Sequence, residues 1–157
     1  MSHPLVDKPV PKDITLKNQD NEDVKLDSLI AGKPSVVFFY PKDETYGCTK
    51  EVCSFRDSYE EFSKVGATVV GISADPPESH KKFISSQKLQ FQLLSDTEGK
   101  ARKAFEVPKT LGFLSGRITY LISKDGIVKD IFNSQLNFTG HAEKAVEFVK
   151  TQVEPVT

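Results

Sequence analysis

The sequence predicts an α/β fold in which helices cover both faces of a central sheet, and three observations support this prediction. Apolar strand-like runs alternate with helical patterns through the N-terminal two thirds of the chain, as in proteins whose parallel strands are joined by helices. Two strand patterns then flank a hairpin turn, and an amphipathic helix follows. The chain has 157 residues, enough to bury a core without disulfides. We therefore expect a single domain, 1–157.

Elements in the N-terminal half are predicted from apolar runs, helical spacing and turn residues. Residues 1–12 contain three prolines and are expected to form an irregular arm. The run Asn18-Gln19-Asp20-Asn21 predicts a turn between two short strands, and Gly66 ends a long helical pattern. The predicted elements are strands at 14–17, 24–26, 35–40 and 68–73 and a helix at 49–65.

The C-terminal half is predicted in the same way. Pro77 and Glu78 fit the first turn of a helix. Residues 107–116 are rich in glycine and apolar side chains and are expected to form a loop. The turn Lys124-Asp125-Gly126 predicts a hairpin. The predicted elements are helices at 77–88, 99–105 and 141–152 and strands at 91–94, 118–123 and 127–132.

The composition argues against several classes of function. A net charge of −1 gives no general attraction to nucleic acid or to anionic membranes. No apolar stretch approaches the roughly 18 residues of a membrane span. The first residues lack the charged-then-apolar profile of a secretory signal. We therefore expect a cytoplasmic protein, or an organellar one if a transit peptide has been removed.

The two cysteines are too few for a secreted disulfide scaffold. In a reducing compartment, a close pair of cysteines indicates redox chemistry or a metal. The three histidines, His3, His80 and His141, are scattered along the chain and are expected to face solvent. They form no zinc-like spacing with the cysteines, so we expect no metal site built from these residues.

Cys48 is expected where a strand leads into the first turn of a helix. It follows the apolar run 35–40, and Val52, Phe55, Tyr59 and Phe62 then recur at helical spacing. Unpaired backbone N–H groups and the positive end of the helix dipole favour an anion at such a position. The sequence therefore places this thiol where the thiolate, its reactive form, is favoured.

Cys53 follows Cys48 by five residues. In a continuous helix this spacing is about 7.5 Å of rise and about 140° of rotation. A disulfide needs Cα atoms within about 4.4–6.8 Å and converging side chains. The two thiols therefore cannot join while the helix is intact, and joining them requires its first turn and more to unwind.

The loop before Cys48 has suitable residues for a reactive site. Pro41 ends the strand and stiffens the entry to the loop. Gly47 leaves the backbone near the thiol unshielded by a side chain. Thr45 lies three residues before Cys48, which brings its hydroxyl near the sulfur, although a plain helix cap explains a threonine here equally well.

A cation would complete this site by stabilising the thiolate. Arg117 is the candidate, because it opens a later strand, stays charged and offers five fixed donors. Glu51 is a candidate partner that orients it, and a first-turn acid favoured by the helix dipole is the alternative. For Arg117 itself, an ordinary surface ion pair remains the alternative.

These residues resemble those of the peroxiredoxins, which are thiol-dependent peroxidases. The family pattern Pro-x-x-x-Thr-x-x-Cys is met by Pro41, Thr45 and Cys48. Cys53 matches the second cysteine of the Q-type, or bacterioferritin-comigratory-protein-like, subgroup, in which both cysteines lie on one helix. Arg117, in Gly-Arg-Ile-Thr-Tyr, matches the family arginine. The resemblance extends from about residue 14 to residue 150.

The resemblance implies a thioredoxin-like three-layer fold, with a central mixed sheet flanked by helices and an N-terminal β-hairpin extension. It implies that Cys48 attacks a hydroperoxide and becomes a sulfenic acid. Cys53 then forms an intramolecular disulfide with Cys48. Substrate binding is assigned to four residues: Pro41, Thr45, Gly47 and Arg117. Thr45 and Arg117 are also expected to take part in catalysis.

The resemblance also implies partners and a role. Thioredoxin, or glutaredoxin, is expected to restore the thiols, and no metal, flavin or haem is needed. The substrates are expected to be hydrogen peroxide and organic hydroperoxides, with an apolar rim of Tyr46, Phe113 or Leu114 favouring the organic ones. Tyr46 stands where similar proteins usually carry proline. A monomer that serves antioxidant defence and redox homeostasis is expected.

Two other functions use the same cysteines. A disulfide reductase is typified by Cys-x-x-Cys and a proline that opens a later strand, whereas this chain has Cys-x-x-x-x-Cys and Arg117-Ile118-Thr119. A redox sensor would use the unwinding of the helix to change a partner surface. Slow peroxide turnover despite fast sulfenic acid formation would favour the sensor.

Overall fold

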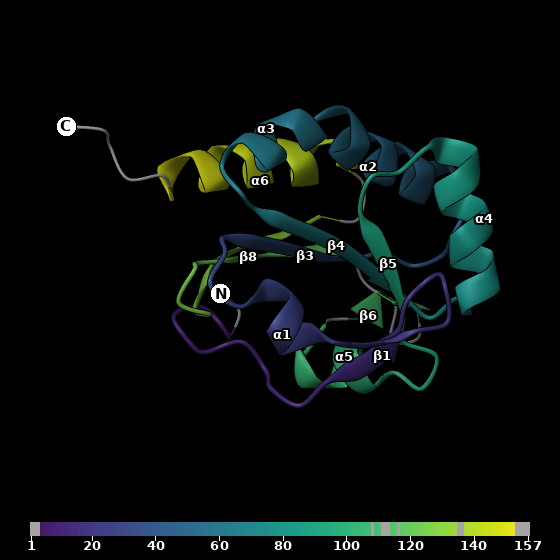
Figure 1. The fold of residues 1–157 in the computed structure, drawn as a ribbon, viewed down its shortest axis with the longest axis horizontal. Helices are drawn as coiled ribbons and strands as arrows, with labels where there is room; N and C mark the ends of the chain where they lie inside the picture. Colours follow the sequence, from purple (N-terminus) through teal and green to yellow (C-terminus); the bar gives the residue numbers. More distant parts are fainter. Residues whose placement is uncertain (1–3, 108, 111–113, 116, 135–136, 153–157) are drawn as a thin grey trace.

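A mixed sheet of seven strands lies at the centre of the protein in the computed structural model, which describes residues 4–107, 109, 110, 114, 115, 117–134 and 137–152 (Figure 1). Its strands are β1 (Thr15–Lys17), β2 (Asp23–Lys25), β3 (Ser35–Phe39), β4 (Thr68–Ser73), β5 (Gln92–Ser95), β8 (Ile118–Ile122) and β9 (Val128–Asn133). They lie in the order β2-β1-β5-β4-β3-β8-β9. The three strands β3, β4 and β5 are parallel, and the other neighbouring pairs are antiparallel.

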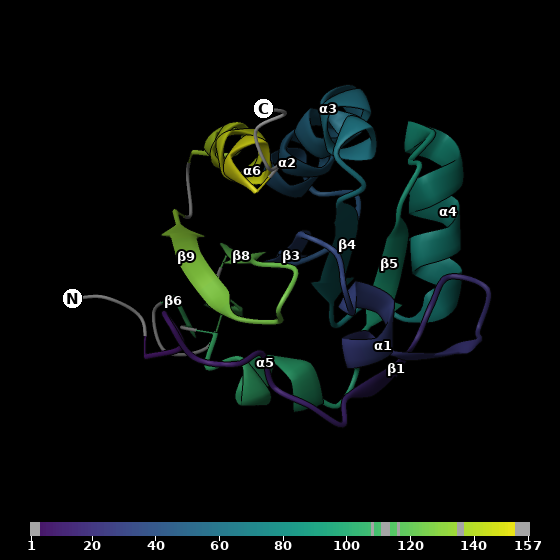
Figure 2. The same cartoon turned by 60° about the vertical axis from the view of Figure 1, so that its left-hand side comes forward.

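Helices cover both faces of the sheet. They are α1 (Leu26–Ile30), α2 (Tyr46–Asp57), α3 (Tyr59–Lys64), α4 (Pro77–Gln87), α5 (Lys100–Ala104) and α6 (Gly140–Thr151). Figures 1 and 2 show α2, α3, α4 and α6 on one side of the sheet and α1 and α5 on the other. None of the helices in the described ranges combines the length and the apolar character that a membrane crossing requires.

The central strand β3 supplies side chains to two separate cores, because successive residues of a strand point to opposite faces. Val37 and Phe39 pack with the helices α1 and α5. Val36 and Phe38 pack on the other face with α2, α3, α4 and α6. All five residues of β3 are buried, so the strand is a rigid support for the loop that follows it.

The architecture confirms the α/β fold with a mixed sheet and an N-terminal hairpin, here β1 and β2. The irregular arm is anchored to the hairpin turn before β9: the backbone N–H of Val10 donates to the carbonyl of Gly126 at 2.8 Å, and Val128 N–H donates to Lys8 at 2.9 Å. Its described residues therefore pack on the sheet rather than extending from it.

The predicted helix at 49–65 is wrong in two respects. It begins earlier, at Tyr46, because Thr45 has the extended backbone conformation of an N-cap, and it is interrupted at Ser58, which separates α2 from α3. The short helix α1 was not predicted, nor was the small hairpin of β6 (Lys109–Thr110) and β7 (Leu114–Ser115) within the predicted loop at 107–116. Elements of two to five residues are too short to show a periodic pattern.

Candidate active site

Cys48 is the third residue of α2. The first backbone bond of this helix in the i to i−4 pattern runs from Thr49 N–H to the carbonyl of Thr45, at 2.8 Å. The amide of Cys48 therefore belongs to the first turn, whose N–H groups have no acceptor within the helix. Its side chain is only 1% exposed. The sulfur thus lies at the positive end of a helix and away from bulk water, where an anion is stabilised by fixed dipoles.

Arg117 links the sulfur to a buried carboxylate. Its Nη1 donates to Cys48 Sγ at 3.4 Å and to Glu51 Oε1 at 2.7 Å. Burial lowers the pKa of the Arg117 guanidinium, but Glu51 and Cys48 raise it more, so that it lies above its usual value. The structure therefore places a permanent cation against the thiol, held from the other side by an acid one turn further along α2.

Glu51 is fully buried, and its two oxygens differ in their surroundings. Oε1 accepts from Arg117, whereas Oε2 has no hydrogen-bond partner among the described residues and lies 3.7 Å from His141 Nδ1. Burial raises the pKa of Glu51 to about 8, and the contact with Arg117 opposes that rise. This carboxyl group is therefore held where its charge is costly.

The prediction that His141 faces solvent is wrong, because its side chain is completely buried. Its Nε2 faces the carbonyl of Ser134 at 2.8 Å, and its Nδ1 faces the Thr119 hydroxyl at 2.7 Å. Burial lowers the pKa of His141 to about 4, with a smaller contribution from Arg117. The ring is therefore neutral, with Nε2 as donor and Nδ1 as acceptor.

An aromatic wall of Tyr46 and Phe138 borders the site, and its inner member, Phe138, was not predicted from the sequence. The Phe138 ring lies 4.9 Å from the Arg117 guanidinium carbon and packs edge to face with Tyr46 at 6.2 Å between ring centroids. Tyr46 itself is 74% exposed. A Cβ on Gly47 would come within 2.6 Å of Phe138 and 3.0 Å of Arg117 Nη2, so only glycine fits there.

The other two residues of the predicted apolar rim are Phe113 and Leu114. Phe113 lies outside the described residues, and Leu114 is described only in its backbone. Phe138 carried no pattern of its own in the sequence, because it precedes the closing helix in a segment without periodic apolar residues. Its place at the site depends on the return of the chain from β9 to α6.

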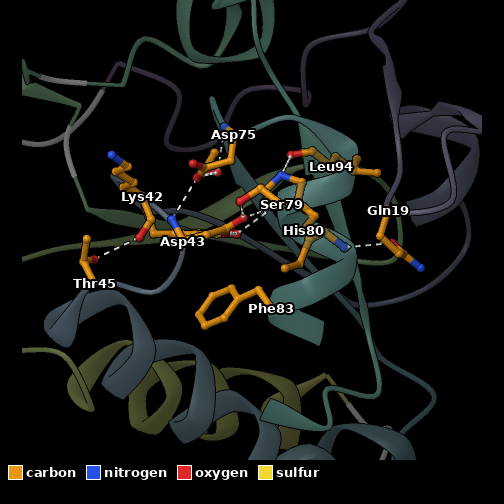
Figure 3. A network of polar contacts seen from close by, with 12 residues as sticks. Gln19, Lys42, Asp43, Thr45, Asp75, Ser79, His80, Phe83 and Leu94 are labelled. Atoms are coloured by element: carbon orange, nitrogen blue, oxygen red, sulfur yellow. Dashed lines mark hydrogen bonds and ion pairs between the residues drawn. The ribbon is translucent and has the colours of Figure 1, made fainter. Parts of the chain in front are cut away.

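Thr45 caps the helix by position, but its side chain makes no cap hydrogen bond. Its hydroxyl instead donates to the carbonyl of Lys42 at 2.9 Å, within the same loop (Figure 3). Donation to Lys42 leaves the hydroxyl oxygen able to accept from another group. Pro41 follows β3 by two residues and is half-buried at the start of this loop.

A buried polar cluster fixes the loop between Pro41 and Thr45 (Figure 3). The Asp43 carboxylate accepts from Tyr40 Oη at 2.6 Å, from Ser79 Oγ at 2.8 Å and from His80 Nδ1 at 2.7 Å. Its backbone N–H donates to Asp75 Oδ2 at 2.8 Å. Burial, followed by the Asp43 carboxylate, raises the pKa of Tyr40, so this hydroxyl stays a donor. The loop is thereby joined to β3, β4 and α4.

His80 was also expected to face solvent, and this prediction is wrong because the ring is completely buried. Its Nε2 lies 3.0 Å from the carbonyl of Leu94, opposite the bond from Nδ1 to Asp43. Because both ring nitrogens face oxygen acceptors, both bonds are made only when the ring carries two protons. A sequence signal existed: His80 precedes Phe83 and Ile84 by three and four residues, on the apolar face of α4. The third histidine, His3, lies outside the described residues.

Three side chains of this cluster, Asp43, Asp75 and His80, have possible metal-ligating atoms within 4.8 Å of one another. Asp75 Oδ2, Asp43 Oδ2 and His80 Nδ1 are engaged in hydrogen bonds. These bonds explain why the three side chains lie together.

Cys53 is half-buried and lies in the second half of α2. Both cysteines are present as thiols. Cys53 also lines a surface hollow, formed by Tyr46, Thr49, Lys50, Ser54, Arg56, Asp57, Ser58, Thr139 and Glu143. The two thiols therefore differ: Cys48 is enclosed beside a cation, and Cys53 is open to a partner from outside. This arrangement suits a thiolate nucleophile at Cys48 and a second thiol, Cys53, that reacts after it.

The sequence of this chain is similar to those of known proteins over most of its length. The model of the AhpC/TSA family matches residues 6–131. The chain is 48% identical over 143 residues to the chloroplastic peroxiredoxin Q of Gentiana triflora, covering 90% of this chain and 65% of that protein. It is 49% identical over 142 residues to the protein of the same name from Sedum lineare, covering 90% and 76%.

Among solved structures, the peroxidoxin BcpB of Mycobacterium tuberculosis superposes with a TM-score of 0.88 at 35% identity, over 97% of this chain and 100% of that one. This likeness confirms the thioredoxin-like fold. The chain spans about two thirds of the length of most of the curated plant relatives it matches.

Proposed function

The chain belongs to the AhpC/TSA family, and within it to the peroxiredoxin Q group, and from this premise we propose that it is a thiol-dependent peroxidase. One observation supports the proposal more than any other: the Arg117 guanidinium lies 3.4 Å from Cys48 Sγ at the start of α2. A thiol enclosed by a cation and a helix N-terminus is suited to act as a thiolate nucleophile.

In the first step, the Cys48 thiolate attacks the terminal oxygen of a hydroperoxide. The S–O bond forms as the O–O bond breaks, the sulfur is oxidised to a sulfenic acid, and the leaving hydroxide or alkoxide takes a proton from water. In this proposal, Arg117 and the Cys48 amide stabilise the charge that develops on the leaving oxygen. Thr45 contributes through its hydroxyl oxygen, and Pro41 and Gly47 shape the space for the peroxide.

In the second step, the Cys53 thiol attacks the Cys48 sulfenic acid. The S–S bond forms, the S–O bond breaks, and the hydroxyl leaves with the proton of Cys53 as water. The helical spacing of the two residues requires the start of α2 to unwind for this step. Unwinding also separates Glu51 from Arg117, so it takes apart the charge-stabilising arrangement of the first step.

A dithiol of the thioredoxin or glutaredoxin type then reduces the disulfide by exchange. The hollow that Cys53 lines supports access from outside. Hydrogen peroxide and organic hydroperoxides are the proposed substrates, and the Tyr46–Phe138 wall supports the organic ones. We also propose a monomeric single domain that serves antioxidant defence. For the location, the names of the plant relatives support an organelle over the cytoplasm.

Peroxide consumption tests the proposed function, with thioredoxin, thioredoxin reductase and NADPH supplying electrons. We expect turnover in the wild type, none in Cys48→Ser, and loss of thioredoxin-dependent turnover in Cys53→Ser. If wild-type thiols remain titratable after peroxide, the peroxidase proposal is wrong. Fast sulfenic acid formation with slow turnover would instead favour the redox sensor.

A further inference from the structure

Cys53 is held in place by one side chain from another helix. Its Sγ lies 3.2 Å from Oε1 of Gln87, the last residue of α4, and donates its S–H to that oxygen. The amide oxygen of Gln87 is an acceptor only, so the bond exists while Cys53 carries its proton. The contact joins two helices on the same side of the sheet (Figure 2).

The position of Gln87 is itself fixed by α2. Its backbone carbonyl accepts from Arg56 Nη1 at 2.9 Å. The carbonyl of Arg56 in turn accepts from Gln90 Nε2 at 3.3 Å. Lys88, the C-cap residue that follows α4, has the left-handed conformation with φ of 56°, and the chain turns there toward β5. The C-terminal end of α4 is thus tied to the second half of α2 by bonds that do not involve the thiol.

The surroundings of Cys53 favour the thiol. Burial raises the pKa of Cys53, Arg56 and Lys50 oppose that rise, and Asp57 adds to it. A protonated, hydrogen-bonded thiol is a poor nucleophile toward peroxide, so Cys53 stays reduced while Cys48 reacts. The same bond must break before Cys53 can move toward Cys48.

We propose that Gln87 is a positioning residue that holds the Cys53 thiol on α4 and thereby sets the rate at which the Cys48–Cys53 disulfide closes. This inference rests on the resolving role proposed for Cys53. Gln87 touches no reacting atom of the peroxide. It stabilises the wound helix with the thiol docked, so that the sulfenic acid persists until Cys53 leaves the amide. Closure then forms the S–S bond, breaks the S–O bond and releases water, as described above.

Two substitutions at Gln87 have opposite expected effects. Gln87→Ala removes the acceptor, so we expect disulfide closure to become roughly twofold to threefold faster, the scale of a hydrogen bond at the weak end of the usual range, because a thiol is a weak donor. Gln87→Glu puts a charged acceptor at the same distance, which holds the thiol proton more firmly. We therefore expect closure to become slower by a similar factor. Damage to the fold would move both variants in one direction.

The experiment mixes reduced protein with one equivalent of hydrogen peroxide, quenches at set times with dimedone, and measures intact masses of the sulfenic acid adduct and the disulfide. Gln90→Ala and Gln90→Glu are matched controls, because Gln90 bonds the carbonyl of Arg56 but not the thiol. Both controls should close at the wild-type rate. The rate of the first oxidation should be the same in all five proteins.

The outcomes distinguish the positioning role of Gln87 from the resolving role of Cys53. Opposite shifts at Gln87 with unchanged controls support the inference. Unchanged closure in both Gln87 variants, or shifts in the same direction, overturns the inference while leaving the resolving role intact. A wild type that forms the sulfenic acid but no disulfide overturns the resolving role of Cys53 and the inference with it.

Discussion

The two sides of Cys48 are held by different kinds of contact. On the N-terminal side, the Asp43 carboxylate accepts three hydrogen bonds, and its backbone N–H makes a fourth, inside a buried cluster. On the C-terminal side, Cys53 is held by one thiol hydrogen bond to Gln87 at 3.2 Å. Bonds to charged groups are roughly twice as strong as neutral ones, and a thiol is a weak donor.

The difference indicates which side moves. The loop that carries Thr45 is joined to β3, β4 and α4 and stays in place when the helix opens. The segment from Cys48 to Cys53 has the weaker attachment and must unwind for the thiols to meet. Glu51 lies between them: its buried carboxyl has one good bond, to Arg117, and one oxygen without a hydrogen-bond partner among the described residues. Releasing it to water therefore costs less than breaking a fully bonded pair.

The largest effect is expected from Asp43→Asn, which disrupts the buried cluster on the N-terminal side of Cys48. The substitution leaves His80 without its carboxylate and places an amide donor against other donors. Breaking a buried charged pair costs about 3–5 kcal/mol, so we expect a loss of that size in the free energy of unfolding, measured in urea. Asp23→Asn removes an exposed carboxylate paired with Lys17 and should cost less than about 1 kcal/mol. Equal effects would show that the cluster does not anchor the loop.

The next largest effect is expected from Arg117→Lys, which changes the group beside the Cys48 sulfur and leaves the Asp43 cluster intact. A lysine keeps the charge but cannot reach Cys48 and Glu51 with the fixed geometry of a guanidinium. We expect the second-order rate constant of Cys48 with hydrogen peroxide to fall about 100-fold, as when one transition-state donor is removed. Arg102→Lys, on the far side of the sheet beside Asp96, should leave that rate unchanged. A rate within twofold of the wild type for Arg117→Lys would remove Arg117 from the mechanism.

The smallest effect concerns Glu51, on the C-terminal side of Cys48, and the way in which it makes the free energy of unfolding depend on pH. Burial raises the pKa of Glu51 from 4.5 to about 8, so the folded protein binds this proton more tightly than the unfolded chain does. The stability that Glu51 contributes is therefore complete below pH 4.5 and is lost as pH rises through about 8.

In a Cys48→Ser background, which removes the thiol's own titration, we expect the free energy of unfolding to fall by on the order of 1 kcal/mol between pH 6.5 and 8. His141 has its folded-state pKa lowered to about 4, so in that range its ring titrates only in the unfolded chain, which opposes the fall by less than about 0.5 kcal/mol. Adding Glu51→Gln should abolish the fall. A slope that persists in the double variant would assign it to another group.

The sequence predicted much of this arrangement where local pattern decides structure. The buried strands β3 and β4 appeared as unbroken apolar runs, and the end of β3 fixed where the loop begins. The position of Cys48 at the start of a helix followed from spacing, whereas the assignment of Thr45 and Arg117 to the site depended on the resemblance to the peroxiredoxins.

Other features depend on contacts between distant segments. The helix begins at Tyr46 because the loop before it is held by Asp43, and Glu44 has a positive φ of 62° there, a conformation that a non-glycine residue adopts only when its surroundings hold it. Phe138 reaches Gly47 only through the path of the chain from β9 to α6. The burial of His80 was readable from its spacing to Phe83, but its partners Asp43 and Leu94 were not.

Hydrogen exchange followed by NMR, on the reduced protein and on the disulfide form made with peroxide, tests the central claim that one side of Cys48 opens while the other stays fixed. We expect the amides of residues 49–53 to exchange at least about tenfold faster in the disulfide form. The Asp43 amide, bonded to Asp75, should keep its reduced-state rate. Unchanged protection of residues 49–53 in a protein that contains the disulfide, or loss of protection at Asp43 as well, would contradict the account.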